Sequence, residues 1–302
     1  MAGSNKEQKS RQKPKHERFT KSKSTLLNDL CFPKFCCAHG GRGMRKVFAI
    51  ARKEFGSFFH SWTGVMTAVM FFAVTGIFFV ILTLNFAQIS MDPRSAGLSS
   101  FPNISQTHYV FGSLFLNLNV ILLFLVPLIT MRSFAEERKH ETLELLFTYP
   151  LTDLEIVAGK LLGLIWFFEM LLVPLAGYAL VFYWIGGELD WGPVLSAFLG
   201  FWVLGMAYLS AGVFVSTLTK SSVMSAVGTF GILVIFWMMD FAPMSGGGGV
   251  SVVVNAMSPL RHFRNFTYGI LDLRDLIYFA FFFFYFLFLS LRSIETRNWK
   301  ES

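Results

Sequence analysis

The hydrophobic residues of this chain gather into long uninterrupted runs, rather than alternating with polar residues or recurring on one helix face. A run of about 20 apolar residues is long enough to cross a bilayer as one helix. A helix that is apolar on every side leaves no face for water. The runs occupy residues 62–86, 110–131, 161–185, 194–218, 222–241 and 276–291. The pattern therefore predicts an all-α integral membrane protein with six transmembrane helices, of which the last is the shortest.

Composition strengthens this prediction and changes how the charge is interpreted. Of the 302 residues, 54% are hydrophobic and only 15% are charged, which is far to the apolar side of soluble domains. The net charge of +7 would suggest nucleic acid as a partner in a soluble protein. Here the basic residues crowd into the N-terminal segment and the loops beside the apolar runs, so they are better explained as topology signals. Lipid, and not nucleic acid, is the expected surrounding.

Lysine and arginine near the runs predict the orientation. The segments 45–53, 132–160 and 292–300 contain most of them, and all three fall on one side of the membrane when six runs are threaded in order. The opposite loops contain fewer, with an exception in the loop 243–274, where three arginines weaken the rule. The excess of basic residues marks the cytosolic side. Both termini are therefore predicted to be cytosolic.

Residues 1–43 differ from the rest of the chain. They are rich in lysine, serine and glutamine, and they lack an apolar run, so we predict a disordered basic extension. Cys31, Cys36, Cys37 and His39 lie together in it. Their spacing is unlike that of structural zinc sites, and three cysteines give no even-numbered disulfide framework. No metal site is expected.

Residues 44–60 form a second distinct segment, in which apolar positions recur at helical spacing. The pattern predicts an amphipathic helix in the membrane interface; an ordinary helical lead-in continuous with the first span is the alternative.

The segment 132–160, between the second and third runs, contains two helix-start signals. Ser133 with Glu136 and Thr152 with Glu155 both have the spacing of a capping box, in which the hydroxyl accepts from the third backbone N–H and the carboxylate reaches back. A proline lies between the two boxes. The chain should therefore form a short charged helix outside the membrane before it re-enters as the third span.

The predicted short helix has an apolar group among its charges. Three apolar residues recur at helical spacing, and they suit either a groove on another protein or the ends of the chain's own spans; both readings stand. The three apolar residues are Leu143, Leu146 and Phe147.

A resemblance to a known family gives this segment a role. The run RSFAEERKHETLELLFTYPLTDLEIVAGK at 132–160 resembles the cytosolic signature of ABC-2 type permeases, as do the stretches 50–55 and 257–279 at their own positions. Together these cover the chain from Met44 onward. Within the family, the sequence is most similar to the permeases associated with gliding motility and with copper-site maturation of nitrous-oxide reductase.

The resemblance implies a half-transporter with the fold of a type V-like ABC exporter. It implies a second permease chain, as a homodimer or a related heterodimer, and two copies of a separate ABC ATPase that binds the ATP and magnesium. The resemblance implies that residues 136–147 are the coupling helix seated in the ATPase, with docking residues Glu136, Glu137, Arg138, Glu141, Thr142, Leu143, Leu146 and Phe147. It implies that residues 44–60 are the interfacial helix that moves with the coupling helix, with Arg52, Lys53, Glu54 and Phe55 as its functional positions. The implied location is the bacterial cytoplasmic (inner) membrane. The implied role is export or drive for extracytoplasmic machinery such as gliding, with no catalysis and no cofactor on this chain.

One acidic residue lies inside a predicted span. Glu169 lies inside the third run, where a carboxylate is costly and therefore a functional candidate. If Glu169 couples to protons or ions, the chain would be a stand-alone secondary transporter or channel. The plainer interpretation is a glutamate that is hydrogen-bonded to a neighbouring helix. A membrane scaffold without transport is a further alternative for the function of the whole chain. The chain has no G-x-x-x-x-G-K-[ST] motif for a nucleotide of its own.

Three smaller features leave two readings each. Pro127 and Pro174 should kink the second and third spans, either for gating or as static bends. The loop 243–274 either folds back toward the membrane or is a plain extracellular loop. Close helix contacts, within the chain or at a dimer seam, are expected at small residues, namely Gly112, Gly163, Gly200, Gly205 and Gly212.

Overall fold

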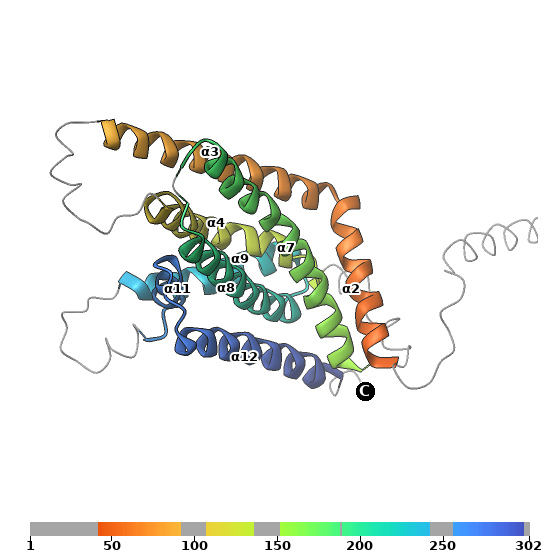
Figure 1. Cartoon of the computed structure of the whole chain (residues 1–302). Coiled ribbons are helices and arrows are strands. Elements are labelled where there is room, and N and C mark those ends of the chain that lie inside the picture. The colour runs from red at the N-terminus through yellow and green to blue at the C-terminus, as the bar shows by residue number, and fades with distance from the viewer. Residues whose placement is uncertain (1–41, 92–106, 136–151, 188, 242–255, 299–302) are drawn as a thin grey trace, which may run out of the picture. The chain divides into compact units, whose positions relative to one another are not determined.

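The computed structural model describes residues 42–91, 107–135, 152–187, 189–241 and 256–298. Within these ranges six helices are long and apolar enough to cross a membrane, which confirms the predicted all-α membrane architecture. Figure 1 labels the helices, which follow the chain in the order given next. They are α2 (Arg42–His60), α3 (Trp62–Met91), η2 (His108–Gly112), α4 (Ser113–Thr130), α7 (Asp153–Trp184), α8 (Trp191–Leu218), α9 (Ser222–Met238), η3 (Met239–Phe241), α11 (Pro259–Thr267) and α12 (Leu273–Asn298).

The helices extend beyond the apolar runs that predicted them. The last span, expected at 276–291 and thought to be the shortest, is part of a helix of 26 residues. The third span, expected to begin at 161, begins at Asp153. In both cases charged residues outside the apolar run continue the helix, because a helix that leaves the hydrocarbon keeps its backbone hydrogen bonds. The apolar run therefore gave the number of spans and not their ends.

Helix α8 is the centre of the bundle, and it contacts α4, α7, α9, α11 and α12 (Figure 1). Its glycines let these neighbours approach closely. A Cβ added to Gly205 would lie 2.2 Å from the ring of Phe168, and one added to Gly212 would lie 2.4 Å from Thr130 Oγ1. Two other glycines that the sequence marked for close contacts also face residues of this chain: Gly163 lies against α2, and Gly200 lies against Phe266 of α11. The dimer-seam reading is therefore wrong for Gly163, Gly200, Gly205 and Gly212.

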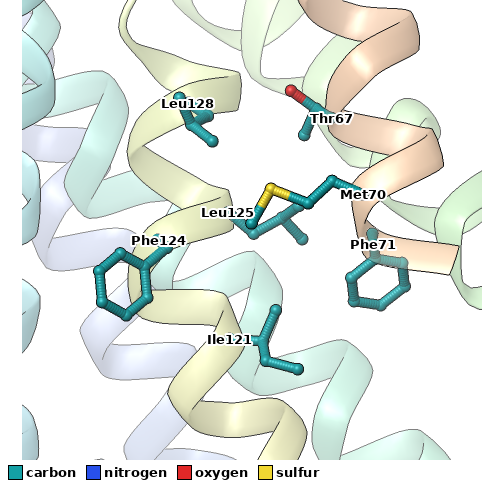
Figure 2. A pocket seen from close by; sticks show the side chains of 7 residues that line it. All are labelled: Thr67, Met70, Phe71, Ile121, Phe124, Leu125 and Leu128. Atoms are coloured by element: carbon teal, nitrogen blue, oxygen red, sulfur yellow. The ribbon is translucent and has the colours of Figure 1, made fainter. Parts of the chain in front are cut away.

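Helices α3 and α4 pack through apolar side chains, with little space left between them. Figure 2 shows Met70 and Phe71 of α3 opposite Ile121 and Leu125 of α4. The crevice between them holds a volume of about 10 Å³, which is at the lower limit for a single water molecule. This contact is a packing seam and not a ligand site.

The second predicted capping box is present at the start of α7. The backbone N–H of Thr152 donates to Glu155 Oε2 over 3.0 Å, and the backbone N–H of Glu155 donates to Thr152 Oγ1 over 3.3 Å. These two bonds satisfy donors that the first turn of a helix leaves free. The box at Ser133 is not settled, because Glu136 lies outside the described residues.

Replacing Thr152 with alanine is expected to lower the free energy of unfolding by about 1 kcal/mol, because the first turn of α7 loses its side-chain acceptor. Thermal unfolding of the purified protein in lipid nanodiscs measures this. The matched control is Thr296→Ala, since the Thr296 hydroxyl donates only to carbonyls of its own helix. An equal shift of the midpoint for both variants would mean that the capping box does not stabilise α7.

Helix α11 folds back into the bundle instead of forming a plain loop. Its residues Phe263 and Phe266 are 0% and 1% exposed, and the helix packs on α8, α4, α9 and α12. At its polar side, Asn265 Nδ2 donates to Asp275 Oδ2 over 2.8 Å, which ties α11 to the start of α12. The plain-loop alternative is therefore wrong for 259–267, whereas 243–255 lies outside the described residues.

Candidate functional site

Helix α2 ends at a sharp corner that is tied to another helix. The helical structure is interrupted at Ser61, between α2 and α3, and Figure 1 shows the two helices running in different directions from this point. Arg132, just past the end of α4, donates from Nη1 to Ser61 Oγ. The position of α2 is therefore linked to the residues where the segment 132–160 begins.

Helix α2 also lies against the first half of α7, at two glycines four residues apart. A Cβ on Gly159 would lie 2.8 Å from Ile50 Cβ, and a Cβ on Gly163 would lie 2.7 Å from Glu54 Cβ. Ala51 of α2 is fully buried at this contact. Small residues at this spacing let two helix backbones approach closely. The contact leaves no room for a larger side chain on this face of α7.

Aromatic rings extend the contact between α2 and α7. Phe58 stacks on Phe167 with ring centroids 4.5 Å apart, and Phe55 meets Trp166 edge-on at 6.3 Å. The predicted apolar face of α2 thus packs on α7 within the same chain. Arg52 and Lys53 are exposed on the other side. The placement of α2 in a membrane interface stays a prediction.

A buried lysine lies at the centre of this contact. Lys160 of α7 is 1% exposed. Its ammonium group is 3.0 Å from Glu54 Oε1, donates a second hydrogen bond to the carbonyl oxygen of Ser133, and lies 4.7 Å from the ring centroid of Phe134. A buried ammonium is tolerated only when it is paired and hydrogen-bonded. The contacts of Lys160 meet this requirement. We call Lys160, Glu54, Ser133 and Phe134 the Lys160 junction.

The Lys160 junction joins three parts of the chain. Glu54 comes from α2, Ser133 and Phe134 from the turn after α4, and Lys160 from α7. The backbone N–H of Phe134 also donates to Ser216 Oγ of α8 over 3.1 Å. The segment 136–151 leaves the described structure directly after this turn and rejoins it at the capping box of α7. The candidate docking residues Glu136, Glu137, Arg138, Glu141, Thr142, Leu143, Leu146 and Phe147 all lie outside the described residues.

The structure brings together some of the predicted site residues and adds new ones. Glu54 and Phe55 both contact α7, as described above. Sequence analysis identified Lys160 only as a topology signal and as the end of the family signature, and it missed the pairing of Lys160 with Glu54. These two residues are 106 positions apart, so no local pattern relates them. The adjacent Gly159 was the one local signal of a close contact at this position, because a glycine near the end of a span lets another helix approach.

Glu169 lies inside the third span, as predicted, and it has a partner on the neighbouring helix. Trp202 of α8 donates from Nε1 to Glu169 Oε1 over 3.2 Å. This agrees with the reading of a hydrogen-bonded glutamate, although the carboxyl side chain is on the exposed side of the helix pair. Pro127 and Pro174 both lie inside continuous helices, α4 and α7.

Comparison with known proteins gives the family. No curated protein matches this chain. The sequence model of ABC-2 family transporter proteins matches residues 48–289, from the first turns of α2 to the last turns of α12. The match does not confirm the finer resemblance to the permeases of gliding motility and nitrous-oxide-reductase maturation. It covers the Lys160 junction, the first five spans and most of the sixth, and by it this chain belongs to the ABC-2 family of transporter proteins.

Proposed function

We propose that this chain is the permease subunit of a bacterial ABC transporter and that a separate ATPase subunit docks beside the Lys160 junction. In this proposal two permease chains, identical or related, assemble with two ATPase subunits in the cytoplasmic membrane. ATP and magnesium bind to the ATPase, and this chain performs no catalysis. Membership of the ABC-2 family supports the membrane role. The observation that carries the docking site is the buried Lys160–Glu54 pair.

The position of this pair explains how docking would act on the membrane helices. The segment 136–151 is anchored at one end by Ser133 and Phe134 and at the other by the capped start of α7. Ser133 and Phe134 contact Lys160, which holds Glu54 of α2, and the capped start lies on the same helix as Lys160. Packed interiors transmit displacement because they compress little. A partner that moves 136–151 would therefore move α2 and α7 together.

Charge supports the proposed orientation. The α2 end of the bundle carries several exposed basic residues, including Arg45, Arg52 and Lys53. Positive charge beside membrane spans marks the cytosolic side. We therefore place α2, the Lys160 junction and both termini in or at the cytosol, where an ATPase is available. The loop with Arg261, Arg264 and Arg274 would be extracytoplasmic, and Arg264 there is paired with Asp240 at 2.7 Å.

The docking proposal predicts a specific loss of ATPase binding. The variant Leu143→Asp, Leu146→Asp, Phe147→Asp, co-expressed with an ABC ATPase that co-purifies with the parent chain, should lose co-purification and permease-stimulated ATP hydrolysis. The reason is that charged side chains in an apolar groove are costly to desolvate. Pull-down on the tagged permease and phosphate release measure the two effects.

The control for this experiment is Leu154→Asp, which changes an apolar side chain on the first turn of α7 that is 58% exposed. It should leave docking and ATP hydrolysis unchanged. Thermal unfolding of each permease alone establishes that the variants fold. If the triple variant folds and still binds and stimulates the ATPase, the docking site assigned to 136–147 is wrong.

A further inference from the structure

A groove lies on the outer side of α7 and α8, and it shares no lining residue with the Lys160 junction. The groove is open to the outside and has a volume of about 380 Å³, whereas the crevice between α3 and α4 has a volume of about 10 Å³. Small-molecule sites in proteins occupy about 300–1,000 Å³ and are mostly apolar with a few polar groups. The groove has this character. Its lining residues are Glu169, Leu172, Val173, Ala176, Phe198, Leu199 and Trp202.

The groove contains a single charged group, the Glu169 carboxyl. Trp202 Nε1 donates to Glu169 Oε1 over 3.2 Å. Within the part of the chain that the structure describes, no other group donates to this carboxyl. Glu169 lies inside the third span, on a helix of 32 residues, and it is exposed on the outside of the bundle. A carboxylate inside a span requires a counter-charge or a donor.

The apolar side chains around Glu169 cannot supply this counter-charge or donor. Val173 is 67% exposed and Leu199 is 40% exposed, and neither offers a hydrogen bond. Lipid tails would cover these residues, but they would leave the second carboxyl oxygen without a donor. A second copy of the chain is a poor occupant as well, because a twofold contact centred here brings two Glu169 carboxyls into one apolar seam.

The remaining chemistry is that of an organic cation. A carboxylate beside aromatic rings attracts a bulky cation, first through the opposite charge and then through the electron-rich faces of Trp202 and Phe198. The apolar lining suits a cation that is soluble in the bilayer.

We propose that this groove binds one lipophilic organic monocation, which enters from the membrane, with Glu169 as its counter-ion and Trp202 as its aromatic partner. The binding site stands independently of the ATPase. Its interpretation as the site of the transported substrate rests on the proposed permease function.

Binding of tetraphenylphosphonium to the purified chain, without ATPase, tests this proposal. The chain is placed in phosphatidylcholine nanodiscs, and empty nanodiscs give the background partition. Tetraphenylborate serves as the matched probe, because it has nearly the same size and apolar surface with the opposite charge. Tetraphenylphosphonium should bind saturably at one site per chain, and tetraphenylborate should show only background partition.

Glu169→Gln should weaken tetraphenylphosphonium binding at least about tenfold, because the amide keeps the size and loses the charge. Trp202→Ala should also weaken it. Glu295→Gln, which removes a carboxylate that is paired with Arg292 at the far end of α12, should leave binding unchanged. Equal thermal midpoints for Glu169→Gln and the parent protein ensure that a loss of binding is not a loss of fold.

Two results would overturn the proposal. One is equal binding of the two ions, or tetraphenylphosphonium binding that Glu169→Gln does not change. The other is efficient disulfide cross-linking of Val173→Cys between two copies in native membranes, which would make the groove an interface between permease chains. Because no ATPase is present, either result leaves the docking experiment on 136–147 unaffected.

Discussion

Replacing Lys160 with methionine is expected to lower the free energy of unfolding of the permease by about 3 kcal/mol. Methionine fills a similar volume, so the loss comes from charge and hydrogen bonding. The Glu54 carboxyl, with a side chain only 18% exposed, loses its cation, and the carbonyl of Ser133 loses its donor. Removing one partner of a buried ion pair costs about 3–5 kcal/mol. We take the lower figure because water reaches Glu54. Denaturant unfolding in mixed micelles measures the change.

The matched control is Arg292→Met on α12, which breaks the pair of Arg292 and Glu295. These two groups are 2.9 Å apart, and their side chains are 63% and 48% exposed. Exposed pairs contribute about 0–1 kcal/mol, so this variant should be nearly neutral. The double variant Lys160→Met, Glu54→Gln should recover part of the loss, since it no longer leaves a carboxylate unpaired. If Lys160→Met costs no more than Arg292→Met, the Lys160 junction does not hold α2 to α7.

The Lys160 junction also shows where prediction from the sequence stops. Apolar runs predict each span, because the requirement of the bilayer acts on consecutive residues. The Glu54–Lys160 pair joins residues 106 positions apart, and its formation depends on how α2 rotates about its own axis against α7. Periodicity places Glu54 on a helix but does not say which helix it faces. The capping box at Thr152 was predictable for the opposite reason, since its two partners are three residues apart.

The sequence contained the apolar pattern of helix α11 but did not show that this helix packs into the bundle. Leu260, Phe263 and Phe266 recur at three-residue spacing and are all buried, so the pattern of a buried helix face was present. The helix has nine residues, too short to span a bilayer, and its arginines argued for a loop. Its burial against α8 depends on Gly200, whose added Cβ would lie 2.5 Å from Phe266. That contact requires the arrangement of two helices that are distant in sequence.

Glu169 was likewise recognised as unusual without its setting. A lone carboxylate in an apolar run is visible in any sequence. Its neighbour Trp202 and the groove they share depend on the contact between α7 and α8, and on Ala176 being small where Phe198 and Leu199 frame the groove. The sequence therefore located the residue, and packing gave it a surface with a definite chemistry.

Replacing Gly163 with leucine is expected to separate α2 from α7 and to abolish permease-stimulated ATP hydrolysis. A Cβ at this position would lie 2.7 Å from Glu54 Cβ and 2.8 Å from the carbonyl oxygen of Ala51. The second contact is with backbone, which a rotamer change cannot relieve. Helix α2 must therefore shift, and the shift pulls Glu54 away from Lys160. Overpacking of this kind costs about 1–3 kcal/mol, and the loss of the ion pair adds to it.

The comparison that isolates this effect is Gly177→Leu, on the same helix, where an added Cβ meets nothing within 4 Å. Leucine there should be neutral or slightly stabilising, because glycine in a helix interior costs about 1 kcal/mol relative to better helix formers. Gly163→Ala should fall between the two. Unfolding free energy and ATPase stimulation are measured for all three variants with the same ATPase partner. Retained stimulation in a folded Gly163→Leu protein would show that the close contact of α2 and α7 is not the route by which the ATPase acts on the spans.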